Sequence, residues 1–214
     1  MRVHLLIPGA GGVAWYWHRV VPLLEHAIAI DLPGDDPSAG LPEYADLVVA
    51  AAGDADEVVM VAQSMGAFTA LPACQRLPVS RLVLLNAMIP EPGETAGAWW
   101  GNTRSEEARR AAARAGGWSE EIDLDTYFLH DVDPEILAGG EERNEEEIAF
   151  QTPCEFAVWP RTTVLAGRDD RFFPLEFQRR VARERLGLDV VEVPGGHLNS
   201  LSRPEAVAAA IAAP

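Results

Sequence analysis

The chain has 214 residues, of which 48% are hydrophobic and 23% charged, a composition typical of a soluble globular protein rather than a disordered or fibrous one. Its 33 acidic and 17 basic residues give a net charge of −16, which argues against nucleic acid as a partner because phosphates are bound by positive patches. No apolar stretch approaches the roughly 20 residues that a membrane-spanning helix needs, so we expect no membrane partner.

The first apolar run, residues 3–7, is too short for a secretory signal and predicts a first strand. Cys74 and Cys154 stand alone, without the spacing of a metal site or a redox pair. We therefore expect two reduced thiols in a cytoplasmic protein. No motif implies a metal or an organic cofactor, and the sequence leaves the oligomeric state open.

Short apolar runs alternate with helical patterns along most of the chain, which is typical of a parallel sheet covered by helices on both faces. The length favours one α/β domain over residues 1–214. Strands are predicted at residues 3–7, 27–31, 58–62, 82–86, 162–167 and 189–193. Helices are predicted at residues 16–26, 41–53, 65–77, 174–187 and 204–212.

The alternation stops in a segment rich in Ala, Glu, Arg and Trp, at about residues 91–160. Its composition favours helices at 104–115 and 133–150. Because ligands bind beyond the carboxyl ends of the strands in such sheets, we expect this insertion to form a helical lid over an active site. A helical excursion packed away from the site is the alternative.

A glycine-rich loop, residues 8–12, follows the first predicted strand. Glycines permit backbone geometry that leaves amide N–H groups pointing into a pocket. We expect the amides of Ala10 and Met65 to form an oxyanion hole. The glycine spacing fits neither Gly-x-Gly-x-x-Gly nor the P-loop, which argues against nucleotide binding.

Ser64 lies between the predicted strand 58–62 and the helix predicted from residue 65. A sharp turn at this point would lift the hydroxyl clear of the sheet, and Ala62 and Gly66 are small enough to flank it. A serine hydroxyl is a weak nucleophile that needs a neighbouring base. Ser64 is therefore the candidate nucleophile, and its small neighbours alone would be weak evidence without the strand and helix around them.

His197, after the last predicted strand and preceded by two glycines, is the candidate base. The other histidines, His4, His18, His26 and His130, are interpreted as structural, with His130 a distant alternative. Asp170, just past the strand 162–167, would orient the imidazole. Asp169 is the neighbouring alternative, and either carboxylate could instead cap the helix predicted from residue 174.

Large apolar side chains are concentrated in and beside the insertion. Because ligand cavities are mostly apolar, we interpret these as candidates for an acyl or aryl pocket, with packing in the core as the alternative. The substrate-binding candidates are Trp99, Trp100, Met88 and Phe128.

These motifs together resemble the α/β-hydrolase superfamily over nearly the whole chain, in the order nucleophile, acid, base. The loop 5–12, Trp15-Tyr16-Trp17, the segment 21–24 and Asp31-Leu32-Pro33-Gly34 are most similar to the methylesterase and hydroxynitrile lyase branch. The resemblance implies an α/β-hydrolase fold with about six mostly parallel strands, flanking helices and a helical lid.

The chain departs from this branch at several positions. Pro8 and Gln63 stand where relatives usually or often have histidine, before the oxyanion glycine and before the nucleophile. Gly9 and Leu198 occupy the places of the threonine and lysine of the lyases. Cyanide would thus lack a cationic stabiliser, and the resemblance implies hydrolysis with Ser64, Asp170 and His197 as triad.

The sequence therefore predicts a serine hydrolase, similar to carboxylesterases, that cleaves a small ester or thioester with an apolar moiety through an acyl-enzyme on Ser64. Two alternatives stay open. The fold could serve a lyase or a cofactor-free oxygenase that uses His197 as base, or a non-catalytic protein that binds a small molecule.

Overall fold

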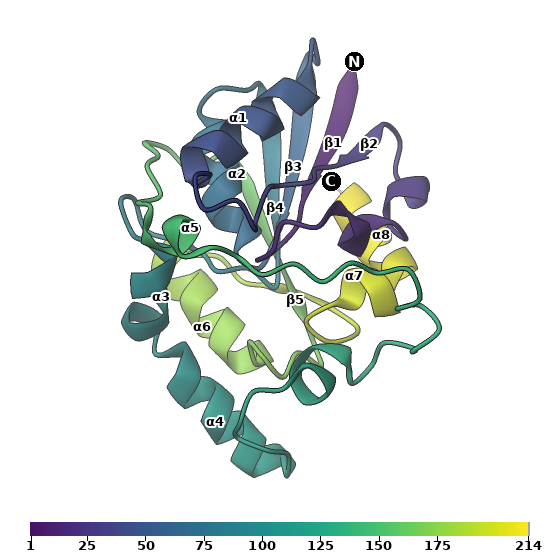
Figure 1. Ribbon diagram of the computed structural model, residues 1–214, viewed down its shortest axis with the longest axis vertical. Helices are drawn as coiled ribbons and strands as arrows, with labels where there is room; N and C mark the ends of the chain where they lie inside the picture. Colours follow the sequence, from purple (N-terminus) through teal and green to yellow (C-terminus); the bar gives the residue numbers. More distant parts are fainter. Residues whose placement is uncertain (214) are drawn as a thin grey trace.

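Six parallel strands form the sheet at the centre of the protein, in the order β2-β1-β3-β4-β5-β6 (Figure 1). The structure is a computed structural model and describes residues 1–213. The strands are β1 (Arg2–Ile7), β2 (Ala27–Ala29), β3 (Glu57–Gln63), β4 (Val79–Leu85), β5 (Thr162–Gly167) and β6 (Val191–Val193). The predicted fold class, a parallel sheet of six strands flanked by helices, is confirmed.

Alternate residues of the central strands enter two separate apolar cores, one on each face of the sheet. In β3, Val58 and Met60 belong to the core on one face, while Val59 and Val61 belong to the core on the other. All four are fully buried. A strand covered on both faces needs apolar residues at every position, which explains the unbroken apolar runs in the sequence.

The helices cover both faces and also form the segment between β4 and β5. They are α1 (Leu41–Ala52), α2 (Gly66–Cys74), α3 (Ala96–Thr103), α4 (Ser105–Gly116), α5 (Glu147–Gln151), α6 (Leu175–Leu186), α7 (Asn199–Ser202) and α8 (Pro204–Ala212). Shorter turns are η1 (Ala14–Trp17), η2 (Val21–Leu23) and the π-helical η3 (Asp125–Leu129). In Figure 1, α3 and α4 extend below the sheet together with α6.

Five of the predicted helices correspond to α1, α2, α4, α6 and α8, with ends that differ by at most three residues. The helix predicted at residues 16–26 is wrong, because this segment forms only the two short turns η1 and η2. Pro22 removes a backbone donor that an α-helix would use there. His26 adopts a positive φ of 48°, which ends any right-handed helix.

The helix predicted at residues 133–150 is also wrong, since only α5 is helical in this range. Its interior would hold Gly139, which has a φ of +87°. The backbone there bonds instead to distant parts of the chain, as when the Glu146 amide donates to the Gly34 carbonyl at 2.7 Å. Tertiary contacts replace the helix that the composition favours.

The sheet order reverses direction between β1 and β3, because β2 lies on one side of β1 and β3 on the other. Ligands bind at such switch points, beyond the carboxyl ends of the strands. The glycine-rich loop after β1 and Ser64 after β3 therefore lie beside each other at this edge.

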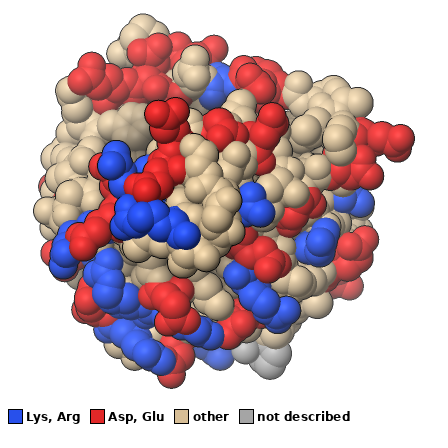
Figure 2. Space-filling model, turned by 90° about the horizontal axis from the view of Figure 1, so that it is seen from below, with Lys and Arg blue, Asp and Glu red and all other residues tan. Residues whose placement is uncertain are grey.

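The surface carries arginines interspersed with acidic side chains, as the view from below shows (Figure 2). On α4, for example, Arg110 pairs with Glu106 at 2.6 Å and Arg114 pairs with Glu120 at 2.9 Å. Much of the positive charge is thus neutralised locally. Within residues 1–213, no helix combines the length and apolar character needed to cross a membrane.

A buried ion pair attaches the start of the insertion to α6. Arg185 and Glu94 form a two-pronged contact, and their side chains are 8% and 5% exposed. Arg185 also donates to the Ile89 carbonyl at 2.7 Å, and Asn102 donates to Glu94 at 2.8 Å. Burial opposes ionisation of Glu94, but the hydrogen bonds from Arg185 and Asn102 outweigh it and lower the pKa of this carboxyl.

We predict that Arg185→Met lowers the free energy of unfolding by about 3–5 kcal/mol, because it leaves the Glu94 carboxylate buried without its partner. Arg183→Met is the matched control on the same helix, since Arg183 is 66% exposed and an exposed pair contributes less than about 1 kcal/mol. Urea unfolding of both variants measures the difference, and equal losses would contradict this account.

Candidate active site

Ser64 occupies a strained turn between β3 and α2, with a φ of +52°. The turn depends on small neighbours, because a Cβ on Gly66 would lie 2.4 Å from the Pro8 carbonyl oxygen. A Cβ on Gly9 would lie 3.0 Å from the Ser64 Cβ. The positive φ and close packing place the hydroxyl at the top of the sheet, as in the turn that carries the nucleophile in α/β-hydrolases.

The structure brings Ser64, His197 and Asp170 together. His197 Nε2 lies 3.1 Å from Ser64 Oγ, and His197 Nδ1 lies 2.8 Å from Asp170 Oδ2. The three residues are 9%, 2% and 5% exposed, respectively. Because a carboxylate can only accept, the contact with Asp170 favours the tautomer with the proton on Nδ1 and leaves Nε2 free to accept from Ser64.

The Asp170 carboxylate is fixed on both oxygens. Oδ1 accepts from the amides of Phe172 and Phe173 at 2.8 and 2.9 Å, and Oδ2 accepts from Gln178 at 3.3 Å as well as facing His197. Asp169, the neighbouring alternative, instead accepts from the Gly195 amide at 3.1 Å. The geometry thus favours Asp170 over Asp169 as the partner of the imidazole.

Two polar side chains at the ends of buried strands hold the backbone of His197. Gln63 Nε2 and Asn86 Nδ2 each donate to the His197 carbonyl at 3.0 Å. Asn86 also accepts from the Gly167 amide at 2.6 Å, which joins the loop to β5. The sequence reasoning noted Gln63 only as a departure from related chains and missed Asn86, although a polar residue at the end of an apolar strand was the available signal.

The amides of Ala10 and Met65, predicted as oxyanion donors, both border the cavity that contains Ser64. Within residues 1–213, neither amide donates to a protein acceptor. The next amide in the loop, that of Gly11, is by contrast bound by Glu145 at 2.6 Å. Two unpaired N–H groups beside a serine hydroxyl are what an oxyanion hole requires.

The cavity at Ser64 and His197 has a volume of about 470 Å³, within the range of small-molecule sites. Three of the predicted substrate-binding residues, Met88, Trp100 and Phe128, line it. Most of the other side chains around it are apolar, whereas the polar ones outside the Ser–His pair lie mainly at residues 141–144. The cavity suits a substrate with an apolar moiety.

Trp99 lies in the core rather than in the cavity. It is fully buried, donates through its indole N–H to the Ile89 carbonyl at 2.9 Å, and packs against Phe173 and Phe177 with ring centroids 5.3 and 5.8 Å away. Adjacent helix residues point in different directions. Trp100 therefore faces the cavity, while Trp99 anchors α3 in the core. Trp99 does not line the cavity, so the structure does not support it as a substrate-binding residue.

Three aromatic rings surround the imidazole of His197. The ring centroids of Phe128, Phe172 and Phe173 lie 5.4, 5.1 and 5.1 Å from it, each nearly perpendicular. This packing restricts the tilt of the imidazole and keeps water from one side of the site. Phe128 comes from the insertion, which therefore contributes directly to the surroundings of the base.

Two carboxylates of the insertion bind the loops that carry the site. Asp131 accepts from the Gly196 amide at 2.9 Å and from the Ser202 hydroxyl at 2.7 Å. Glu145 accepts from Gly11 and from the Tyr44 hydroxyl, at 2.6 and 2.5 Å. The sequence reasoning missed both residues, because nothing local distinguishes them from the other acids of the insertion.

The remaining histidines lie outside the serine–carboxylate arrangement. His4 Nδ1 contacts the Glu25 carbonyl and His18 Nδ1 the Trp15 carbonyl, both at 2.8 Å. His26 precedes β2. His130 packs under the Gly195–Gly196 turn with its Nε2 buried, and burial together with the nearby Arg171 lowers its pKa. In the described part of the chain, no group of three or more candidate metal ligands occurs.

Comparison with known proteins places this arrangement in a wider context. A model of the alpha/beta hydrolase family matches residues 5–210. No curated protein matches the chain in sequence.

Among solved structures, a pyrethroid hydrolase from Sphingobium faniae JZ-2 is similar with a TM-score of 0.77 and 23% identity, covering 99% of this chain and 96% of that one. Polyneuridine aldehyde esterase is similar with a TM-score of 0.75 and 20% identity, covering 99% of this chain and 98% of that one. The methylesterase protein MES16 from Arabidopsis is similar with a TM-score of 0.74 and 17% identity, covering 98% of this chain and 97% of that one. At these identities the likeness shows the fold.

Burial of the Glu145 carboxyl in the insertion can be tested through the pH dependence of stability. Burial raises the pKa of its carboxyl, against the opposing hydrogen bonds from Tyr44 and Gly11. A raised pKa means that the folded protein binds the proton more tightly than the unfolded chain does. The stability that protonation contributes is present at low pH and is lost as the pH rises through the folded-state pKa.

We predict that Glu145→Gln, which stays neutral, becomes progressively more stable relative to wild type as the pH rises from about 4 to about 8. Chemical unfolding at several pH values measures the difference. Glu142→Gln, at an exposed position of the same segment, is the matched control. A difference that is constant or shrinks with pH would contradict the raised pKa of the Glu145 carboxyl.

Proposed function

This chain belongs to the alpha/beta hydrolase family, and we propose that it hydrolyses a small ester or thioester with an apolar moiety through an acyl-enzyme on Ser64. The observation that carries the proposal is the hydrogen-bonded series Ser64, His197, Asp170 facing an apolar cavity of about 470 Å³. The similar structures are named as a hydrolase and two esterases, which agrees with this reaction class.

In the first step the Ser64 hydroxyl attacks the substrate carbonyl carbon while His197 Nε2 takes the hydroxyl proton. The Asp170 carboxylate faces Nδ1 of the same ring and stabilises the imidazolium that forms. The carbonyl oxygen becomes an oxyanion, which accepts hydrogen bonds from the amides of Ala10 and Met65. Removing one such donor typically costs about 3 kcal/mol of transition-state stabilisation.

The leaving alkoxide or thiolate then takes the proton from His197 as the tetrahedral intermediate collapses, and the acyl group stays on Ser64 Oγ. A water molecule attacks this acyl-enzyme with His197 again as the base. The second tetrahedral intermediate releases the carboxylic acid and restores the serine hydroxyl. Each step uses groups of this chain and water alone.

The cavity lining close to the reacting groups supports a substrate with an apolar moiety. Met88, Trp100, Phe128 and Phe172 supply flat or flexible apolar surface close to the reacting groups. Since a ligand gains affinity mainly by burying apolar area in such a cavity, esters with an aromatic or medium alkyl group are the best candidates. The insertion supplies part of this lining, which supports its role as a lid.

We predict that Ser64→Ala lowers kcat for 4-nitrophenyl butyrate by at least about a thousandfold, because losing the nucleophile of such a triad removes most of its catalysis. Steady-state hydrolysis by purified wild type and variant measures this. Comparable turnover by both proteins would remove Ser64 from its role and favour a lyase or oxygenase that uses His197 as base. Binding without turnover in wild type would favour a non-catalytic protein.

We predict that Asp170→Asn lowers kcat by about ten-thousandfold, because an amide favours the wrong imidazole tautomer. Asp169→Asn is a matched control one residue away. It disturbs the contact with the Gly195 amide, so its kcat is expected to fall by less than about tenfold, the scale of one ordinary hydrogen bond. The reverse ranking would assign the acid to Asp169.

A further inference from the structure

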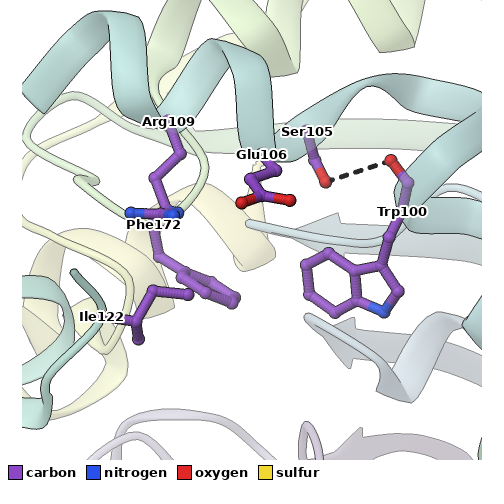
Figure 3. Close-up of a pocket in the computed structure, with 6 residues that line it drawn as sticks. All are labelled: Trp100, Ser105, Glu106, Arg109, Ile122 and Phe172. Atoms are coloured by element: carbon purple, nitrogen blue, oxygen red, sulfur yellow. Dashed lines mark hydrogen bonds between the residues drawn. The ribbon is translucent and has the colours of Figure 1, made fainter. Parts of the chain in front are cut away.

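A second cavity, of about 280 Å³, shares lining residues with the catalytic one. Figure 3 shows the side chains that line the second cavity. Its lining comes from α3, α4, the segment before η3 and the loop after β5. In Figure 3, Glu106 and Arg109 project from α4 toward a space bordered by the apolar side chains. The lining residues are Trp100, Ser105, Glu106, Arg109, Ile122 and Phe172.

The two cavities share a wall of aromatic side chains. Trp100 and Phe172 line both, and their ring centroids are 5.8 Å apart. Phe172 is also one of the rings that surround His197. The second cavity is therefore separated from the catalytic site by about one layer of rings.

Arg109 is the unusual feature of this cavity. It is 5% exposed, and its hydrogen bonds go to two neutral oxygens, the Glu120 carbonyl at 2.6 Å and the Tyr127 hydroxyl at 2.9 Å. Both bonds use Nη1, whereas a guanidinium has five N–H donors. The other donors of Arg109 have no acceptor among residues 1–213.

The nearby carboxylates do not neutralise Arg109. Glu106 pairs with Arg110, and the Glu120 carboxylate pairs with Arg114. Across residues 1–213, Arg109 has no carboxylate within 4.0 Å. The Arg109 guanidinium carbon lies 5.0 Å from the centre of the Tyr127 ring, which stabilises part of its charge. A carboxylate that enters this cavity would supply the anionic partner that the ring does not.

We propose that this second cavity binds a small apolar carboxylic acid, with Arg109 holding the carboxylate and Trp100, Ile122 and Phe172 surrounding the apolar stem. Arginine binds carboxylates through paired N–H···O bonds, and the aromatic walls match an aryl or alkyl group. The Glu106 carboxylate in the same lining disfavours a dianion such as phosphate. The ligand class is therefore a monoanionic acid with an apolar end.

Ester hydrolysis releases acids of this class, so the second cavity would hold a reaction product next to the site that forms it. That connection rests on the proposed function. The binding of the acid rests only on the residues described above, and direct titration tests it whether or not the protein cleaves esters.

The experiment compares 3-phenylpropanoate with its neutral amide, 3-phenylpropanamide, by isothermal titration calorimetry. We expect saturable binding of the acid to wild type, with the amide at least about tenfold weaker, as expected for loss of a charged hydrogen bond. Arg109→Met should weaken binding of the acid to a similar extent. Equal binding of acid and amide, or no saturable binding of the acid, would overturn the proposal.

Two further variants decide the question should Arg109→Met fail to fold. Ile122→Trp alters a residue that is 55% exposed and that lines the second cavity but not the catalytic one. Because the larger ring would fill the second cavity, this variant should bind the acid at least about tenfold more weakly. Glu106→Gln removes the competing negative charge and should strengthen binding of the acid. Wild-type affinity in Ile122→Trp would place the acid in the catalytic cavity and contradict the proposal.

Arg114→Gln is the matched control, because it removes the same charge from an exposed position of the same helix. We expect it to bind 3-phenylpropanoate as wild type does. An equal loss in Arg114→Gln and Arg109→Met would show that affinity follows overall charge rather than the buried guanidinium, and would likewise reject the site.

Discussion

The contact between the Ser64 hydroxyl and His197 Nε2, at 3.1 Å, is the interaction on which the rest of the site depends. The residues that form it are 133 positions apart in the chain, so the sheet must bring them to one edge. The parallel order does so by turning every strand's carboxyl end the same way. Gln63 and Asn86 then fix the His197 backbone, and Asp170 and three aromatic rings fix its imidazole.

The insertion between β4 and β5 is part of this site rather than a separate cover. Its Glu145 binds the loop that offers the Ala10 amide, and its Asp131 binds the loop that carries His197. Both loops thus take one of their acceptors from a segment distant in sequence. The loop with the Ala10 amide and the loop with His197 are thus both attached to the insertion, which connects the proposed oxyanion donor and the proposed base to the same segment.

The strands, the turn at Ser64 and the fold class could be predicted because each rests on a short local pattern. The prediction of a helix at 133–150 failed because it rested on the helical preference of Ala and Glu. Gly139 has a positive φ, and the amide of Glu146 donates to the Gly34 carbonyl rather than within a helix. Asn86, Asp131 and Glu145 could not be singled out, since their roles depend on amides far along the chain. Trp99 and Trp100 are equivalent in sequence, and only the packing of α3 distinguishes core from cavity.

The central claim, that the Ser64 hydroxyl gives its proton to His197, is tested most directly by the rate of covalent labelling with a fluorophosphonate, read by peptide mass spectrometry. The account predicts modification on Ser64 alone in wild type and at least about a hundredfold slower labelling in His197→Gln, since the unassisted hydroxyl is a weak nucleophile. Labelling at a different serine, or an unchanged rate in His197→Gln, would contradict it.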